Sequence, residues 1–369
     1  MRTLFLSLIV SISCAAQDMP IDKSATVQTV ALYRHLKALP TKGFLFGHQD
    51  DLAYGVGWKY IDGRSDIKDV TGDYPALYGW ELGRIELDHP MNLDGVPFDK
   101  MRRYIREAYE RGGVITLSWH LNNPLTSGTA WQPAPGTVAS ILPKGEKNQL
   151  YKTWLDKVAS FLLSLKDKNG TSIPVIFRIF HELNGNWFWW GGKNCTPEEL
   201  KQLWQFTVSY LRDTKQVHNL LYAFNTDRFT NEAAWLERYP GDEWVDVAGF
   251  DIYQAYDIAK NEDFKKAFDQ MLTTLEQLAG AHRKIPAVTE FGYNGIPDDS
   301  WWTQTFLKTI KNHKIAYVMA WRNAGEKPDG KQEFYVPYKG QQSATDFKKF
   351  YDDPQTLFQK EASKENWYR

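Results

Sequence analysis

The 369-residue chain contains little cysteine and no surplus of either charge. Its two cysteines are Cys14 and Cys195, and Cys14 falls in an N-terminal segment that we expect to be removed or modified. A chain left with Cys195 alone forms no internal disulfide bond. The 44 Lys and Arg residues balance 45 Asp and Glu residues, which gives a net charge of −1. Such a chain is poorly suited to nucleic acid or to an anionic membrane surface, and we expect neither as a partner.

Long hydrophobic runs are also missing, apart from a short one near the start. Residues 4–12 form an apolar run, interrupted only by Ser7 and Ser11, that follows Arg2 and precedes the small residues of the stretch 13–16. This run is too short to span a bilayer but has the pattern of a secretory signal peptide that is cleaved after Ala16. The alternative is a lipoprotein signal, with Cys14 as the lipidated first residue. Either form predicts an exported protein, periplasmic or extracellular, with no integral membrane segment.

Three common catalytic motifs are absent. The stretch Gly55-Val56-Gly57 lacks the third glycine of a dinucleotide-binding loop, and no Gly-x-Ser-x-Gly elbow occurs. His181-Glu182 begins like a zinc-protease motif, but Gly185 stands where the second histidine is needed. We therefore expect neither a metal ion nor another cofactor.

What the chain has in abundance is aromatic residues (15%) and a regular alternation of short β-rich runs with longer amphipathic stretches. The aromatic content excludes intrinsic disorder. Strands are predicted at 44–47, 76–81, 114–120, 175–180, 220–224, 247–252, 287–291 and 316–321, and the clearest helices at 99–111, 148–166, 197–214, 262–278 and 300–312. Eight such units predict one (β/α)8 TIM barrel over residues 17–369. A doubly wound open sheet is the alternative.

In a (β/α)8 barrel the active site forms at the carboxyl ends of the strands. Polar and aromatic residues gather there in this sequence, at 48–51, 81, 119–120, 181–182, 225–227, 251–253, 290 and 321–323. Glu182 ends the fourth predicted strand and Glu290 the seventh, so the two face each other across the barrel mouth. Paired carboxylates of this kind suit glycoside hydrolysis, in which one protonates the leaving oxygen and the other attacks the anomeric carbon. Glu182 has the aromatic surroundings that favour a protonated acid.

The segment after Glu182 is the most unusual in the chain. It reads Asn184-Gly185-Asn186-Trp187-Phe188-Trp189-Trp190-Gly191-Gly192, which fits neither a helix nor an alternating strand. Aromatic faces pack against the apolar faces of sugar rings, and they also form hydrophobic plugs. We expect both uses here, with Trp187 exposed to substrate.

At these residues the chain resembles glycoside hydrolase family 26, a retaining (β/α)8 family composed mostly of β-mannanases. The resemblance rests on His181-Glu182-x-x-Gly185-x-Trp187-Phe188-Trp189-Trp190-Gly191, on Thr289-Glu290-Phe291-Gly292, and on His120, Tyr253 and Trp321. It extends over nearly the whole mature chain. One departure is Ile179, which follows Arg178 where the family often has proline.

The resemblance implies roles for individual residues. Glu182 corresponds to the acid/base, Glu290 to the nucleophile, and Tyr253 to the residue that orients the nucleophile. Substrate-binding roles are implied for His120, His181 and Trp321 at the −1 subsite, Trp187 at +1, Arg322 at −2, and Trp131, whose loop closes over −1.

The function implied is cleavage of β-1,4-mannosidic bonds in mannan, glucomannan or galactomannan, by a monomer. Alternatives are a sister specificity, such as β-1,3-xylanase or mixed-linkage glucanase, and a non-catalytic glycan-binding barrel. The stretch 121–145 is long for a barrel loop, and long loops in compact domains are usually functional. We expect it to shape one end of the groove and to favour short products such as mannobiose.

Overall fold

Eight parallel strands form a closed barrel in the computed structural model, which describes residues 19–255, 257–327 and 329–369. In order around the barrel these strands are β1 (Phe44–Gln49), β4 (Leu77–Glu81), β5 (Val114–Ser118), β6 (Val175–Arg178), β7 (Leu220–Thr226), β8 (Val247–Tyr253), β9 (Ile285–Gly292) and β10 (Tyr317–Ala320). The barrel closes because β1 pairs in parallel with both β4 and β10. The predicted (β/α)8 barrel is therefore confirmed, and the open sheet is not. The predicted signal segment, 1–16, lies outside the described residues.

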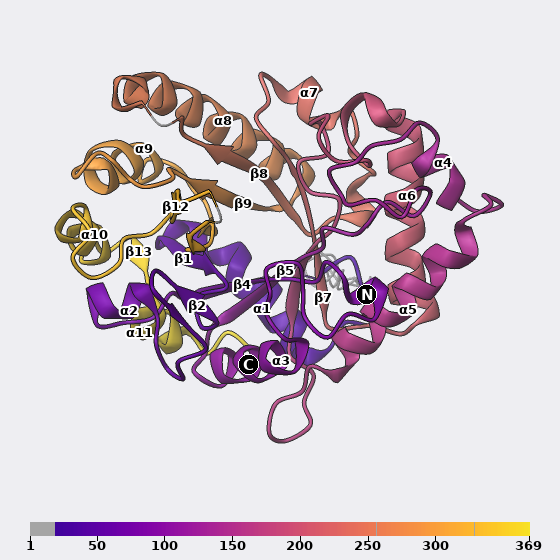
Figure 1. The fold of residues 1–369 in the computed structure, drawn as a ribbon, viewed down its shortest axis with the longest axis horizontal. Helices are drawn as coiled ribbons and strands as arrows, with labels where there is room; N and C mark the ends of the chain where they lie inside the picture. The colour runs from indigo at the N-terminus through magenta and orange to yellow at the C-terminus, as the bar shows by residue number, and fades with distance from the viewer. Residues whose placement is uncertain (1–18, 256, 328) are drawn as a thin grey trace, which may run out of the picture.

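Helices surround the strands, as Figure 1 shows. They are α1 (Val27–Ala38), α2 (Asp66–Thr71), α3 (Phe98–Glu110), α4 (Thr137–Ile141), α5 (Asn148–Ser164), α6 (Pro197–Ser209), α7 (Glu232–Leu236), α8 (Asn261–His282), α9 (Lys308–Ile310), α10 (Ala344–Tyr351) and α11 (Gln359–Ala362). Helix α6 begins with a capping box between Thr196 and Glu199, with Pro197 in its first turn. The helix predicted over 197–214 continues past Ser209 as a π-helix, and the one predicted over 300–312 is π-helical at Trp302–Leu307.

The structure also contains short strands that are not among the eight strands of the barrel. The pairs β2 (Tyr54–Gly55) with β3 (Trp58–Lys59) and β11 (Gly325–Glu326) with β12 (Gln332–Glu333) form small hairpins. Strand β13 (Thr356–Leu357) adds to the start of β1. None of these was predicted, because two-residue strands carry no periodicity that a sequence could reveal.

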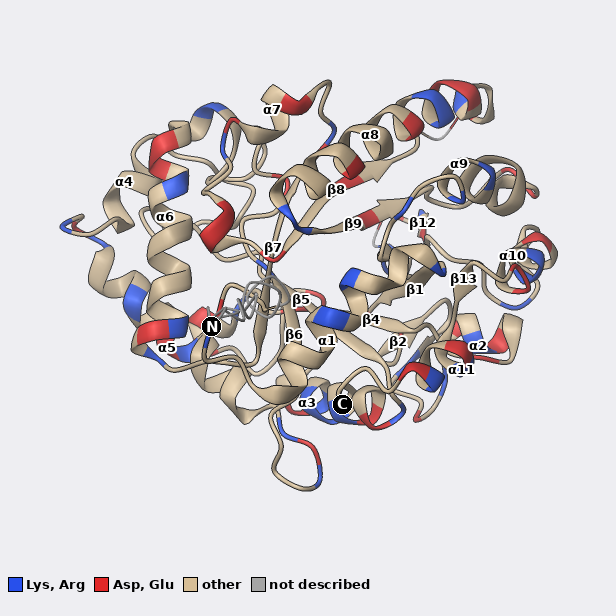
Figure 2. Ribbon diagram, turned by 180° about the vertical axis from the view of Figure 1, so that it is seen from behind, with Lys and Arg blue, Asp and Glu red and all other residues tan. Residues whose placement is uncertain are grey.

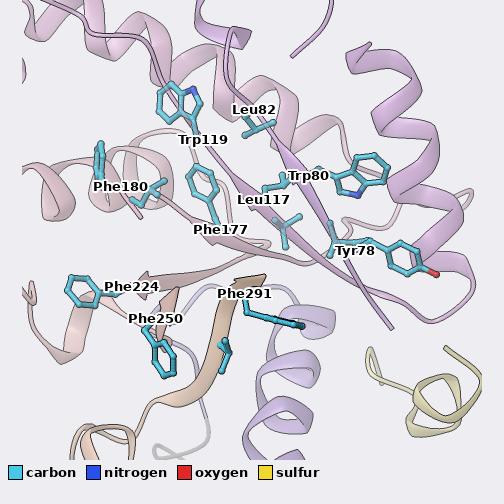
Figure 3. Packing of buried hydrophobic residues seen from close by; sticks show 14 of the residues in the cluster. Tyr78, Trp80, Leu82, Leu117, Trp119, Phe177, Phe180, Phe224, Phe250 and Phe291 are labelled. Carbon is cyan, nitrogen blue, oxygen red and sulfur yellow. The ribbon is translucent and has the colours of Figure 1, made fainter. Parts of the chain in front are cut away.

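Alternate residues of each strand face outward, where they pack against the helices. Figure 3 shows this layer, with Trp80, Phe177 and Phe250 among its labelled members. Trp80 stacks on Tyr104 of α3 with ring centroids 5.7 Å apart. Trp119 belongs to the same layer, fully buried, and donates from Nε1 to Glu86 at 3.0 Å. It is a core residue, although its position at a strand end had pointed to the site.

The inward-facing residues divide the barrel into two ends. At the amino ends of the strands they are apolar, and helix α1 covers them with the fully buried Leu32 and Leu36 (Figure 2). This helix was not among those predicted. At the carboxyl ends the inward residues become charged, which places the site there. Among the described residues, no helix has the length and apolar character needed to cross a bilayer.

Candidate active site

The two predicted carboxylates meet at the carboxyl end of the barrel. One side-chain oxygen each from Glu182, Glu290 and the neighbouring Asp251 lie within 4.8 Å of one another. Glu182 reaches this point through a tight turn after β6, in which Phe180 and Glu182 have φ angles of 48° and 50°. Non-glycine residues rarely adopt such angles, and strain of this kind concentrates at functional sites.

A β-bulge in β9 aims Glu290 into the barrel mouth. The pairing of β8 with β9 matches Phe250 to Val288 but Asp251 to Glu290, so Thr289 is the extra residue. Thr289 occupies the space beside the inward-facing Gly249, where a Cβ atom would lie 2.6 Å from its Cγ2, and it donates to Asp251. The bulge thus lets two successive residues of one strand, Thr289 and Glu290, serve the interior.

Hydrogen bonds hold both oxygens of Glu290. Arg178 donates to Oε2 at 2.6 Å, and the hydroxyl of Tyr253 donates to Oε1. Arg178 is 1% exposed and also donates to Asp251 at 2.9 Å. Asp251 in turn accepts from Asn225 at 2.8 Å. Donors on both oxygens stabilise negative charge on Glu290 and fix its orientation, which suits an attacking carboxylate.

Glu182 lies in a different environment. Its Oε2 accepts from Nε1 of Trp187 at 2.6 Å. Burial, followed by repulsion from Asp251 and Glu290, raises the pKa of Glu182 well above its usual value. A raised pKa favours the protonated form of the carboxyl group, so Glu182 is suited to act as a general acid.

Two histidines form a chain beside the carboxylates. His120 contacts Glu81 through Nδ1 at 2.8 Å, and its Nε2 lies 2.9 Å from Nε2 of His181. Burial, His120 and Arg178 lower the pKa of His181 well below its usual value. With its pKa lowered in this way, His181 is neutral and carries a proton on only one of its two ring nitrogens, Nδ1 or Nε2. The buried Nδ1 has no hydrogen-bond partner in the described part of the chain.

Aromatic side chains form the walls of the mouth. Trp131 is 48% exposed and stacks on His120 at 5.0 Å, while Trp321 lies 6.3 Å from the same ring. Trp187 is 40% exposed. The three aromatic residues that follow it, 188–190, are buried. The aromatic segment therefore packs three of its four aromatic side chains into the layer between strands and helices and leaves Trp187 partly exposed. Contact of Trp187 with a sugar stays a prediction.

Arg322 lies at the edge of the mouth. It donates to Asp94 and, at 3.2 Å, to Glu333. These two bonds connect the loops that follow β4 and β10. The structure thus brings seven predicted residues and the two carboxylates to one end of the barrel, with Arg322 at its rim.

Four residues of this network received no role from the sequence: Glu81, Arg178, Asn225 and Asp251. Strand register could have found them. Arg178 lies two residues after the inward-facing Ile176, and Asp251 lies four after Val247, so both point into the barrel. The same parity separates the inward His120 from the outward Trp119.

The carboxylate cluster also raises the question of a metal ion. In the described part of the chain, the oxygens that lie close enough to bind one metal ion together are those of Glu182, Asp251 and Glu290. The guanidinium of Arg178 already bonds to two of the three. The positive charge of Arg178 offsets the negative charge of these carboxylates, so the cluster suits catalysis better than cation binding.

Comparison with known proteins agrees with the geometry. The model of glycosyl hydrolase family 26 matches residues 21–353. A mannan endo-1,4-beta-mannosidase of Bifidobacterium adolescentis is 34% identical over 94% of this chain and 36% of its own length, so the chain spans about a third of that relative. A solved GH26 beta-mannanase from Bacteroides ovatus, BoMan26A, is 45% identical with a TM-score of 0.88, over 93% of this chain and 98% of that one. The catalytic domain of a Bacillus sp. JAMB-750 GH26 endo-beta-1,4-mannanase has a TM-score of 0.88 and 34% identity, over 95% of this chain and 96% of that one.

Proposed function

Because the chain belongs to glycosyl hydrolase family 26, we propose that it hydrolyses β-1,4-mannosidic bonds with retention of configuration. The observation that carries this proposal is the Glu182–Glu290 pair, whose nearest oxygens are within 4.8 Å. Retaining glycosidases place their two carboxyl groups about 5–5.5 Å apart, whereas inverting enzymes need about 6.5–9.5 Å to admit a water molecule. The short separation favours direct attack by one carboxylate.

The proposed reaction has two displacements. Glu290 attacks C1 of the mannosyl unit at −1 while the proton of Glu182 passes to the leaving oxygen. Glu182, now ionised, then takes a proton from water as the water attacks C1 and releases Glu290. Arg178 and Tyr253 hold Glu290 in line through both steps.

The proposed substrate is mannan, glucomannan or galactomannan. Support comes from the relatives described above, which are named as mannanases. Trp131, Trp187 and Trp321 at the mouth offer apolar faces to sugar rings.

The decisive experiment is a time course of products from linear mannan, galactomannan, β-1,3-xylan and mixed-linkage glucan, with Glu290→Gln as the matched control. Manno-oligosaccharides from the wild-type protein alone would support the proposal. Proton NMR of the first product should show the β-anomer before mutarotation, and an initial α-anomer would contradict retention. Products from the xylan or glucan alone would overturn the substrate, and binding without any product would indicate a glycan-binding barrel.

We propose that mannobiose is the short product and that the loop 121–145 favours its release. Asn123 is fully buried and ties this loop together through bonds to Leu125, Thr126 and Gln132. A deletion would therefore break the loop, and Trp131→Ala is the cleaner test. We expect longer early products from this variant, and an unchanged product pattern would remove Trp131 from this role.

We further propose export through the segment 1–16, with cleavage after Ala16 or lipidation at Cys14. A Cys14→Ser variant of the full-length precursor distinguishes the two forms in a bacterial host. Loss of membrane association would indicate a lipid anchor, and unchanged release would indicate a free exported protein.

A further inference from the structure

The loop after β6 holds the indole of Trp187 against the carboxyl group of Glu182. Three tryptophans of this loop donate through Nε1, but to different kinds of acceptor. Trp189 donates to the Leu121 carbonyl at 3.1 Å and Trp190 to the His181 carbonyl at 3.0 Å. Trp187 alone among these three donates to a side chain, at 2.6 Å. Its bond is therefore part of the site, whereas the other two fix the loop.

Gly185 provides the space that this arrangement needs. A Cβ atom at Gly185 would lie 2.4 Å from ring atoms Cζ2 and Cη2 of Trp187. The φ angle of Gly185 is not among the positive ones, so the backbone does not demand glycine. The ring position therefore explains this glycine, and any side chain here would displace the indole from Glu182.

We propose that Trp187 is a positioning residue for Glu182. The indole N–H of Trp187 selects which carboxyl oxygen of Glu182 carries the proton. In a neutral carboxyl group the N–H bonds to the carbonyl oxygen, here Oε2, so the proton resides on Oε1. The first step then moves the proton from Oε1 to the leaving oxygen, and the same N–H stabilises the carboxylate that remains. This role is separate from stacking on a sugar, and it rests on the proposed function of Glu182.

The charges around Glu182 give the bond a measurable consequence. Asp251, Glu290 and Asp227 all disfavour its ionised form, and Tyr253 lies close enough to interact with it. Arg178 faces the cluster but bonds to Asp251 and Glu290. The bond from Trp187 opposes the acidic neighbours by lowering the pKa of Glu182. Removing the N–H should therefore raise the pKa of Glu182 further.

The test is Trp187→Phe, which keeps an aromatic face and removes the donor. The alkaline limb of the pH profile of kcat/KM reports loss of the proton from Glu182. It should move to higher pH by about half a pH unit or more. The kcat on mannopentaose should fall at least about tenfold, with a smaller loss on a dinitrophenyl β-mannobioside, whose leaving group needs no proton. Trp189→Phe is the matched control, because it removes an N–H that Glu182 does not receive. It should lower Tm and leave the limb in place.

Gly185→Ala tests the same bond without changing the donor. The alanine methyl group should displace the ring and move the alkaline limb in the same direction as Trp187→Phe does. In the Trp187→Phe background Gly185→Ala should have no further effect on the limb, since the donor is already gone. Additive shifts would indicate two independent effects and overturn the proposal.

A direct titration separates this proposal from the reaction itself. The side-chain carbon of Glu182, assigned by comparison with Glu182→Gln in ¹³C-glutamate-labelled protein, should titrate at higher pH in Trp187→Phe than in the wild type. Equal midpoints, with only KM raised, would make Trp187 a stacking surface alone. A wild-type protein inactive on every β-mannan would refute the proposed function, and the titration would still decide whether Trp187 controls Glu182.

Discussion

The two ends of the barrel interior use the same strands for opposite purposes. At the amino ends, inward residues such as Leu45, Leu77 and Ile176 form an apolar core with α1. At the carboxyl ends the same parity places Arg178 and Asp251, both buried and charged. Burying charge is unfavourable unless it is paired, so the carboxyl end depends on networks and the amino end on packing. The comparison teaches that stability and chemistry in this molecule reside at different ends and can be changed separately.

The largest effect should follow from a change at Glu290, the proposed nucleophile. Glu290→Gln should lower kcat/KM on β-mannan by roughly a thousandfold or more, because the amide cannot form the covalent intermediate. The fold should persist, since Arg178 keeps its bond to Asp251. Steady-state kinetics and circular dichroism check both parts. A variant with near wild-type turnover would remove Glu290 from the mechanism.

The next largest effect should follow from a change at Glu182, the proposed acid/base. Glu182→Gln should lower kcat on oligosaccharides by about a hundredfold or more and abolish the alkaline limb, because no proton is then lost from this position. Its raised pKa means that the native protein holds a proton that the unfolded chain releases, so ionisation of Glu182 destabilises the fold as pH rises. Thermal unfolding at pH 8 should therefore show an equal or higher Tm for the variant. A clear loss of Tm would give Glu182 a structural role.

The amino end should show the reverse pattern. Leu36→Ala in α1 removes a fully buried side chain and should lower the free energy of unfolding by about 2–5 kcal/mol. Its kcat on mannan below the unfolding temperature should equal that of the wild type. Urea unfolding and kinetics on the same preparation measure both. A fall in kcat without a fall in stability would show that the two ends are coupled.

A smaller test concerns the buried charge at the amino end. Asp246, just before β8, accepts from the backbone N–H groups of Ile21 and Tyr222 at 2.8 and 2.9 Å. Burial raises the pKa of Asp246 to about 6 from 3.8. Its favourable contribution is therefore complete below pH 3.8 and is lost as pH rises through about 6.

The matched variant is Asp246→Asn. Between pH 4 and 7, wild-type stability relative to this variant should fall by at most about 3 kcal/mol, with no matching change in kcat. Urea unfolding across this range measures the difference. A pH-independent difference would mean that Asp246 is ionised in the folded protein throughout.

The sequence by itself determined the barrel and most of the site. Eight apolar runs with helices between them, each ending in polar residues, were enough to predict that Glu182 and Glu290 share one mouth. That prediction succeeds because all parallel strands of a barrel deliver their carboxyl ends to the same face. The register of those strands would also have assigned Arg178 and Asp251 to the interior.

Only the tertiary structure decided how these residues act on one another. Helix α1 covers the amino end through contacts with strands far away in the chain, and its apolar pattern alone does not reveal this. The bulge at Thr289 and the positive φ angles at Phe180 and Glu182 are set by packing around them. The bonds of Arg178 and Trp187 to the two glutamates depend on distances of a few ångströms. A sequence determines which groups reach the mouth, but their protonation and direction follow from neighbours that folding alone brings together.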